Sequence, residues 1–197
     1  MSISLTYFDF DGSRGLECRL ALKVAGVDFD DVRVKRAQWL DLKPTLPYGA
    51  LPVLDVDGSR LPHSTAILTY VGRTHGLHPS DPLTAAKHEA LMSSVEDLRN
   101  KVPGGGLMED EKKTAREAFA EGWLSRWAQT VSDNIQGPFV EGEALNVVDI
   151  KLYVILRAYL GGTYDHIDPA MFEAWPKLKA LHDAVDAQAA VQGYLQS

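Results

Sequence analysis

The spacing of apolar residues changes part-way along this 197-residue chain, and that change limits the fold more than any other feature of the sequence. In the first 76 residues, short runs with the two-residue period of a strand are interleaved with runs that have the longer period of a helix. After residue 82 only the helical period recurs. We therefore predict a small α/β domain followed by an all-α domain, in a chain long enough to bury a substantial core.

Individual elements follow from the same periods and from the glycines and prolines that interrupt them. The predicted order in the first domain is β-α-β-α-β-β-α, with a hairpin turn at Asp57-Gly58. The prolines of "LHPSDP" indicate a linker at 77–82, which separates a domain of residues 1–76 from one of residues 83–197. The expected strands are 3–8, 27–34, "LPVLDV" and "SRLPHS", and the expected helices are 16–24, 37–43, 64–76, 82–101, 110–135, 146–160, 174–187 and 189–195.

Charge and cysteine content exclude several kinds of partner and site. The chain has 20 Lys and Arg against 27 Asp and Glu, a net charge of −7, which argues against binding to nucleic acid or to an anionic membrane surface. Its single cysteine, Cys18, cannot form an intramolecular disulfide. With one cysteine and six scattered histidines, the sequence predicts no metal site. The first residues lack a secretory signal, and no apolar run approaches the ~20 residues that span a bilayer. We expect a cytoplasmic protein.

The stretch "LPVL", residues 51–54, has the composition of a buried strand but contains a proline at its second position. Proline has no N–H to donate to a sheet, so it belongs at an edge, at the start of a strand or at a bulge. Such a start leaves the backbone N–H and C=O of Leu51 unpaired, at the end of the sheet where α/β proteins bind ligands. The stretch indicates either a slot for a short extended peptide or an edge strand without a ligand.

Two helix starts differ in how their first N–H groups are satisfied. Ser64 is predicted to cap the helix 64–76, but Ile67, three residues later, cannot complete a capping box. The free donors at this positive helix end would bind a carboxylate or phosphate, although water can satisfy them equally well. In "NVVD", by contrast, Asn146 and Asp149 have the pattern of a capping box, which satisfies its own donors.

Two further features are open to a functional or a structural interpretation. Tyr7 lies near the end of the first strand, where its phenol could donate a hydrogen bond to a developing anion or could simply fill space across the sheet. A basic cluster upstream of Pro52 could hold an anion or could form a solvated face. This cluster comprises Arg33, Lys35, Arg36 and Lys43, with Trp39 among them.

Together these motifs resemble the cytosolic glutathione transferases over the whole chain. "LTYF", "SRGLECRLAL", "QWLDLKPTLPYGALPVLDVDG" and "LPHSTAILTYVG" resemble the N-terminal domain of that family. The nearest class is sigma, which includes glutathione-dependent prostaglandin D synthase. "VEDL", "NVVDIKLYVI" and "AWPKLKAL" resemble motifs of the helical domain. The resemblance implies a thioredoxin-like domain followed by a helical domain, in a detoxifying homodimer that uses glutathione as co-substrate and no cofactor.

The resemblance also implies roles for individual residues. Tyr7 would hydrogen-bond the glutathione sulfur, Leu51 would pair with the cysteinyl backbone beside a cis Pro52, and Ser64 would bind the γ-glutamyl carboxylate. His63 stands beside Ser64 where the family usually has glutamine, and it would add a pH dependence. Trp39 and Lys43 would hold the glycine end of glutathione, and Arg14 would line the cleft near the sulfur. Asp97 would reach the glutathione bound to the neighbouring subunit. Phe8 and Phe10 would form part of the wall of the electrophile pocket.

Two departures from the family pattern affect the second-substrate site. The loop "FDFDGSRG" is one residue longer than in close sigma-class relatives, which changes the expected position of Arg14. The stretch "VPGGG" falls where prostaglandin-converting members carry bulkier residues, including an aromatic one. We therefore expect a wider electrophile pocket and do not predict prostaglandin isomerase activity.

Three functions are compatible with these residues. The first is conjugation of the glutathione thiolate to small hydrophobic electrophiles, with Tyr7 stabilising the thiolate. The second is a cysteine-type glutathione oxidoreductase with Cys18 as nucleophile, although Cys18 would lie about a turn inside a helix, beyond the terminus where thiols are activated. The third is a non-catalytic glutathione-transferase-like binding module, since a fold does not imply a function. The presence of Tyr7, Ser64 and the basic cluster together favours the first.

Overall fold

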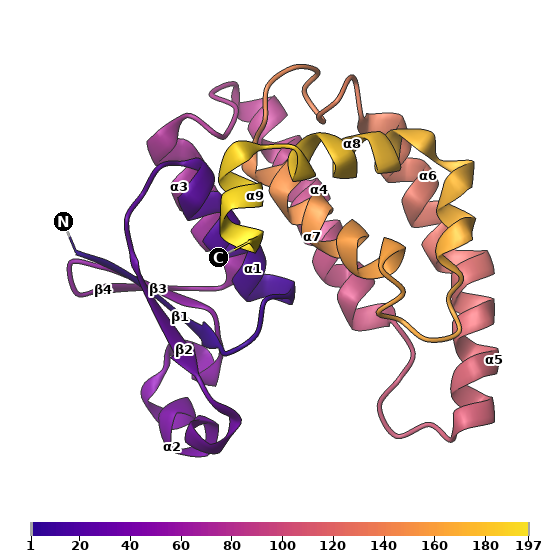
Figure 1. Ribbon diagram of the computed structural model, residues 1–197, viewed down its shortest axis with the longest axis horizontal. Helices are drawn as coiled ribbons and strands as arrows, with labels where there is room; N and C mark the ends of the chain where they lie inside the picture. The colour runs from indigo at the N-terminus through magenta and orange to yellow at the C-terminus, as the bar shows by residue number, and fades with distance from the viewer. Residues whose placement is uncertain (1, 197) are drawn as a thin grey trace.

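The computed structural model describes residues 2–196 and consists of a four-stranded sheet with flanking helices, followed by a helical domain (Figure 1). The strand order is β2-β1-β3-β4, with β1 parallel to β2 and antiparallel to β3, and with β3 antiparallel to β4. This is the thioredoxin-like arrangement that the resemblance implies, and it confirms the α/β domain that the spacing predicts. The strands are β1 (Ile3–Phe8), β2 (Asp30–Val34), β3 (Val53–Val56) and β4 (Ser59–Pro62).

Strand β2 is shorter than the predicted 27–34, so that prediction is wrong at its first three residues. The first paired residue of β2 is Asp30, which lies opposite Ser4 near the start of β1. In this register residues 27 and 28 would extend past the start of β1, and Val27 instead donates its N–H to the carbonyl of Leu22 at 2.9 Å. The length of the strand is therefore set by its partner and not by its own alternation.

Helix α1 (Ser13–Val24) lies between the sheet and the helical domain (Figure 1). It packs against α3 (Ser64–His75) within its own domain and against α7 (Val147–Leu160) of the other. Residues 15–22 are all buried, and they include the charged Glu17 and Arg19. Because a buried charge is costly unless it is paired, this shared helix requires charged partners in its neighbours.

The segment before β3 is a chain of short helical turns where a helix at 37–43 was expected. Two prolines, Pro44 and Pro47, interrupt it, and a proline cannot continue the hydrogen bonding of a helix. In Figure 1 the segment lies at the far end of the sheet from the helical domain. Its parts are η1 (Arg36–Gln38), α2 (Trp39–Leu42), η2 (Lys43–Thr45) and η3 (Pro47–Gly49).

The second domain is built around α7, in which residues 147–156 are all buried. The predicted helix at 110–135 forms as one continuous helical rod. Five of its residues, Ala120–Leu124, take the wider π form, which no local pattern predicts. None of the helices in residues 2–196 is both long and apolar enough to cross a membrane. The other elements are α4 (Pro82–Lys101), α5 (Glu109–Phe119), α6 (Ser125–Asn134), η5 (Pro169–Ala174), α8 (Pro176–Asp186) and α9 (Ala189–Leu195).

The start of α7 has the capping box that "NVVD" predicts. Asn146 takes the cap position, and its N–H donates to Asp149 Oδ2 at 2.8 Å. The other oxygen, Oδ1, accepts the N–H of Val140 at 2.8 Å, so the fully buried Asp149 also ties down the preceding loop. The box holds the N-terminal half of α7 against α1 and α4.

Candidate functional site

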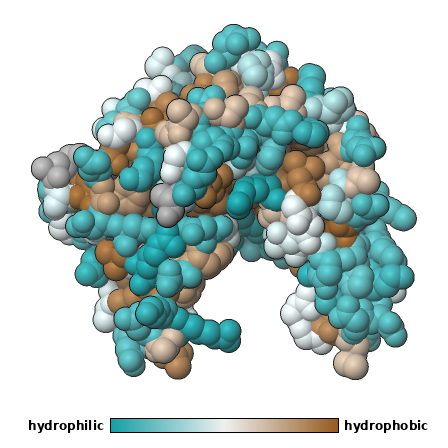
Figure 2. Space-filling view, in the orientation of Figure 1, coloured by the Kyte–Doolittle hydropathy of each residue, from teal (hydrophilic) through white to brown (hydrophobic). Residues whose placement is uncertain are grey.

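Two pockets flank the first turn of α1, one on the side of the sheet edge and one towards the helical domain. The Ser64 pocket has a volume of about 490 Å³ and is lined by Arg14, Ala50, Leu51, Pro52, His63, Ser64, Thr65 and Glu96. The Tyr164 pocket has a volume of about 510 Å³ and is lined mainly by the loop before α1, by Arg99 of α4, and by the second half of α7 with the turn to Tyr164. In Figure 2 the molecular surface is deeply indented between the first domain and α5.

One wall of the Ser64 pocket is backbone without hydrogen-bond partners. The Leu51–Pro52 peptide bond is cis, and the paired part of β3 begins only at Val53. Neither the N–H nor the C=O of Leu51 has a hydrogen-bond partner within residues 2–196. An extended peptide laid against Leu51 would find one donor and one acceptor ready to pair.

The opposite wall is the start of α3, and here the predicted cap is wrong by one residue. The cap position is held by His63, with φ 68° and ψ 123°, and Ser64 is the first helical residue. No side chain caps the helix, so the N–H groups of its first turn have no protein partner and lie at the positive end of the helix. A non-glycine residue at positive φ is strained, which is common where a structure shapes a binding site.

Tyr7 occupies the last inward-facing position of β1, and its side chain is buried against α1. A Cβ on Gly15 would come within 1.9 Å of Tyr7 Cδ1, so only glycine allows the ring to lie on the first turn of the helix. Burial raises the pKa of Tyr7, and a hydrogen bond with Ser13 and the charges of Arg14 and Arg99 oppose that rise. The phenol is therefore neutral at physiological pH and can donate a hydrogen bond. Tyr7 lines neither pocket itself, but its ring lies on the first turn of α1, from which Ser13 lines the Tyr164 pocket and Arg14 lines the Ser64 pocket.

A cluster of five charged residues extends from the wall of the Ser64 pocket to the interior beneath it, and most of it is not predicted from the sequence. Arg14 and Glu96 are partly exposed and line the pocket, whereas the side chains of the other three are buried. Lys151 Nζ lies 2.6 Å from Glu17 Oε1 and 2.7 Å from Glu96 Oε1. Arg99 pairs with the same two carboxylates at 2.7 and 2.6 Å, and Arg14 pairs with Glu96 at 2.6 Å. Lys151 was detectable as a charge inside the apolar run "VVDIKLYVIL", and Glu17 as a charge inside "GLECRL".

The charges of this cluster do not cancel. It holds three cations and two carboxylates, which leaves a net charge of +1 under the pocket. Burial acts to raise the pKa of Glu96, but Lys151 and Arg99 together lower it to about 2, so the carboxylate stays ionised. The cluster therefore presents a positive potential to any group bound between α1 and α3.

Several of the predicted site residues lie outside the Ser64 pocket. Trp39 packs its ring on Phe8, with centroids 5.0 Å apart, and Lys43 Nζ lies 5.9 Å from the centre of the Trp39 ring. Phe10 lines the Tyr164 pocket, whereas Phe8 lines a separate hollow together with Trp39. Asp97 is exposed on α4, and its neighbour Glu96 is the residue that lines the Ser64 pocket within the same chain.

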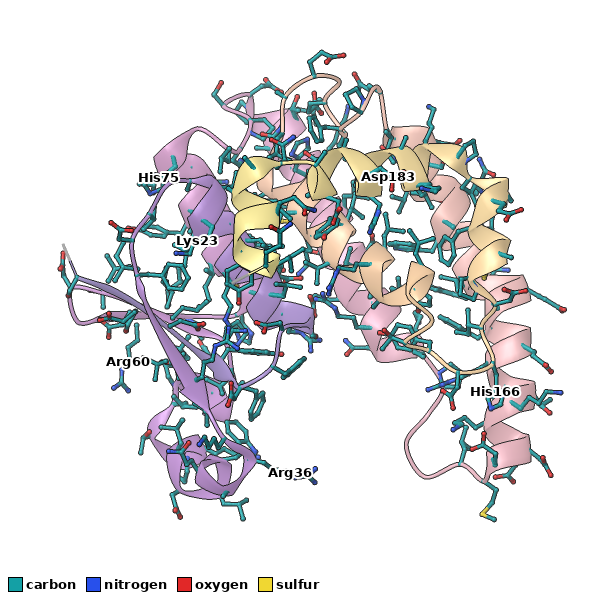
Figure 3. All side chains as sticks on the ribbon, viewed as in Figure 1. Lys23, Arg36, Arg60, His75, His166 and Asp183 are labelled. Atoms are coloured by element: carbon teal, nitrogen blue, oxygen red, sulfur yellow. The ribbon has the colours of Figure 1, made fainter. Side chains whose placement is uncertain are left out.

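The basic cluster predicted upstream of Pro52 is only partly available to an anion. Arg33 is already paired with Asp31 at 2.8 Å and with Asp11 at 2.9 Å, and it also lies near Asp9. Arg36 extends away from the ribbon into solvent (Figure 3), and Lys35 is also exposed. The expectation of a joint anion site fails for Arg33, because acidic residues of β2 and of the loop after β1 neutralise it.

Cys18 does not have the surroundings of a nucleophile. Its side chain is fully buried in α1, and burial together with the neighbouring Glu17 raises the pKa of the thiol well above its ordinary value. The thiolate, which is the reactive form, is therefore disfavoured and has no access to either pocket. The structure contradicts the cysteine-type oxidoreductase.

Among residues 2–196, one group of three side chains has the spacing of metal ligands. Glu109, Asp165 and His166, the last labelled in Figure 3, lie close together where α5 begins. Both carboxylates already pair with cations, Asp165 with Arg116 and both with Lys112. We assign no metal to it.

Comparisons with known proteins agree with this architecture. The family model described as glutathione S-transferase, N-terminal domain, matches residues 3–73, and that of the C-terminal domain matches residues 96–197. The chain is 29% identical to hematopoietic prostaglandin D synthase of Gallus gallus over 196 residues, which cover 98% of this chain and 94% of that protein.

Solved structures share the whole fold. Prostaglandin synthase D of Nilaparvata lugens has a TM-score of 0.87 and 28% identity, over 100% of this chain and 98% of that one. The monomeric glutathione S-transferase Na-GST-3 of Necator americanus has a TM-score of 0.84 and 22% identity, over 100% and 97% of the two chains. Because the two family models cover both domains, the chain belongs to the glutathione S-transferase family and is a glutathione transferase enzyme.

Proposed function

We propose that this chain is a sigma-class, tyrosine-type glutathione transferase, which conjugates glutathione to small hydrophobic electrophiles in the cytoplasm. The observation that carries the proposal is the Ser64 pocket, which the unpaired backbone of Leu51 and the uncapped start of α3 line together with Arg14, a residue of the helical turn on which the Tyr7 ring lies. These groups are complementary to an extended, anionic peptide. They also lie beside a phenol that can donate a hydrogen bond to sulfur.

Glutathione would lie along the Ser64 pocket with its cysteinyl backbone paired to Leu51. The γ-glutamyl carboxylate would accept hydrogen bonds from Ser64 and from the free N–H groups at the start of α3. His63 and Arg14 border the same pocket, and Trp39 with Lys43 would hold the glycine end further along the cleft. Bound this way, the thiol group is directed towards Tyr7.

The thiolate would be stabilised by three features of this chain. A free thiol has a pKa of roughly 8.5, so most of it is protonated at neutral pH and unreactive. The neutral phenol of Tyr7 donates a hydrogen bond, the start of α1 supplies a positive helix end, and the cluster beneath the pocket adds a net charge of +1. Each of them lowers the free energy of the anion more than that of the thiol.

The electrophile would occupy the Tyr164 pocket. This pocket shares the first turn of α1 with the Ser64 pocket, so a sulfur atom near Tyr7 has access to both. Apolar contact comes from Phe10, Leu16, Val154 and Ile155, which matches small hydrophobic second substrates. The non-catalytic alternative gives no reason for a second pocket next to the phenol.

We also propose that the active unit is a homodimer. Tyr48 is 82% exposed in the loop before β3, and an apolar groove of about 440 Å³, lined by Leu91, Trp123 and Trp127, lies between α4 and α6. Tyr48 of each copy would enter that groove of the other, and Asp97 would reach the partner's glutathione, since a two-fold interface makes each contact twice. Na-GST-3 is monomeric, so the fold alone does not enforce this state. Sedimentation velocity of the wild type and of Tyr48→Ala tests it.

The test of the catalytic assignment is Tyr7→Phe. We expect the rate of conjugation with glutathione and a chromogenic electrophile to fall roughly ten- to a hundredfold, the effect of losing a hydrogen bond to a charged group. The pKa of bound glutathione should rise, while its affinity should change little because most contacts lie elsewhere.

The matched control is Tyr70→Phe, which removes the phenol of a helix α3 residue that lines neither pocket and should keep the full rate. A Tyr7→Phe enzyme with an unchanged rate would refute the role of the phenol. Loss of all activity in Cys18→Ala with full activity in Tyr7→Phe would restore the cysteine mechanism.

A further inference from the structure

Lys151 is an ammonium group buried at the centre of the molecule, in the apolar helix α7. No part of its side chain is exposed, and its neighbours in the helix are Ile150 and Leu152, both also buried. A lysine in such surroundings is stable only if its charge and all its N–H groups find partners. The identity of those partners therefore indicates what the residue does.

Three acceptors from three different helices surround the Lys151 ammonium. They are Glu17 Oε1 at 2.6 Å, Glu96 Oε1 at 2.7 Å and Ser64 Oγ at 3.3 Å. An ammonium group has three hydrogen atoms and no lone pair, so in its contact with Ser64 the lysine must be the donor. Each of its hydrogens then has one acceptor.

This contact determines the direction of the Ser64 hydroxyl. A hydroxyl has one hydrogen to donate and two lone pairs, and Lys151 occupies a lone pair. Within residues 2–196 no group accepts the hydrogen of Ser64, and the residue lines the Ser64 pocket. The free direction for that hydrogen is towards the pocket, next to the uncapped N–H groups of α3.

We propose that Lys151 is a positioning residue for the carboxylate of glutathione. By donating to Ser64 Oγ it directs the Ser64 hydroxyl hydrogen at the γ-glutamyl α-carboxylate, so that the helical domain completes a binding site built on the α/β domain. This inference rests on the proposed function and extends it, because Lys151 makes no contact with the ligand itself. It acts through Ser64.

A purely structural role for Lys151 makes a different prediction. If the lysine only neutralised Glu17 and Glu96, its removal would loosen α1, α4 and α7 and would weaken every ligand alike. If it orients Ser64, the loss is confined to ligands that carry the α-carboxylate. Two ligands that differ in this group separate the two roles.

The experiment measures binding of S-hexylglutathione and of its analogue with 4-aminobutanoyl in place of γ-glutamyl, by titration calorimetry. The variants are Lys151→Met and a charge-balanced double variant, Lys151→Met with Glu17→Gln. The double variant keeps the cluster at a net charge of +1, with two cations and one carboxylate. It therefore does not leave the buried Glu17 carboxylate without its lysine, which could unfold the single variant. Lys179→Met, on the exposed face of α8, is the control for removal of a lysine.

We expect the double variant to bind S-hexylglutathione about tenfold more weakly and the decarboxylated analogue less than twofold more weakly. In a Ser64→Ala background, Lys151→Met with Glu17→Gln should weaken the binding of S-hexylglutathione by less than twofold. Equal losses for both ligands, or an unchanged affinity for S-hexylglutathione, would overturn the inference. A wild type that binds neither ligand would instead refute the proposed function, which the calorimetry reveals before any variant is made.

Discussion

Helices α3 and α7 begin in opposite ways, and the difference separates a binding site from a structural support. At α7 the N–H groups of Val140 and Asn146 are satisfied by the buried carboxylate of Asp149. At α3 the cap position is the strained His63, no side chain caps the helix, and the first N–H groups border the Ser64 pocket. We call the start of α7 the closed end, because its own residues satisfy the backbone N–H groups there, and the start of α3 the open end, because its first N–H groups have no cap.

The open end gives up stability that the closed end keeps. A good N-cap contributes about 0.5–2 kcal/mol to folding, and a residue at an unfavourable φ costs roughly 1–3 kcal/mol. A helix start without a cap is thus a free-energy loss that a bound carboxylate can recover. The two ends are physically linked, because Lys151 lies two residues after Asp149 and donates to Ser64. The closed start of α7 holds in place the residue that orients the open start of α3.

The largest expected effect is on stability, at the closed end. Asp149→Ala should lower the free energy of unfolding by roughly 2–4 kcal/mol, because two buried N–H groups lose their acceptor. Urea denaturation measures this loss. The control is Asp168→Ala, which removes an exposed cap that accepts only the N–H of Ala170, and which should cost less than about 1 kcal/mol. A drop for Asp149→Ala no larger than for Asp168→Ala would show that the capping box is not the support described.

The next effect is on binding, at the open end. Ser64→Ala should weaken glutathione binding roughly ten- to a hundredfold, because the hydroxyl donates to a charged carboxylate. The free energy of unfolding should fall by roughly 1–3 kcal/mol, because one N–H of the buried Lys151 ammonium loses its acceptor, whereas Glu17 and Glu96 keep the other two and no cap is lost. Ser125→Ala, at the first residue of α6, is a serine control away from the Ser64 pocket. An unchanged affinity with a clear fall in melting temperature would make Ser64 structural and would remove the contrast between the two helix starts.

The two helix starts also show what can be predicted from the sequence. The capping box of α7 is predicted correctly because its partners, Asn146 and Asp149, lie within four residues of each other. The order of elements was predicted because each period is a local property. Strand β2 is predicted too long because the residue at which it starts depends on β1, more than twenty residues away along the chain.

The cluster beneath the pocket could not be predicted because its partners are far apart in sequence. Lys151 lies 134 residues from Glu17 and 87 from Ser64, and no local pattern links them. For the same reason the local pattern predicts a cap at Ser64, whereas its hydroxyl accepts a hydrogen bond from Lys151 of the other domain. Leu51, Pro52, His63, Ser64 and Arg14 do line one pocket, as the resemblance implies, but their roles in binding stay predictions.

The smallest expected effect is a pH dependence of the free energy of unfolding, which arises from Asp149 at the closed end and not from the open end. Burial raises the pKa of Asp149 to about 7, and the nearby Glu141 adds to the rise, whereas the hydrogen bonds from the N–H groups of Val140 and Asn146 oppose it. In the unfolded chain an aspartate has a pKa of about 3.9, so the folded state holds the proton more tightly. The resulting stabilisation is complete below about pH 4 and is lost as the pH rises through 7.

Between pH 6 and pH 8 this loss amounts to about 1 kcal/mol of unfolding free energy. Asp149→Asn removes the titrating group, so the difference between the two pH values should shrink by that amount relative to the wild type. Ser64→Ala should retain the full difference, because a serine hydroxyl does not titrate between pH 6 and pH 8. All three proteins share the same six histidines, so histidine titration contributes equally to each. Urea denaturation at the two pH values measures each difference. If Asp149→Asn and the wild type lose equal stability, then Asp149 is ionised in the fold, and the closed start of α7 carries a negative charge instead of a proton.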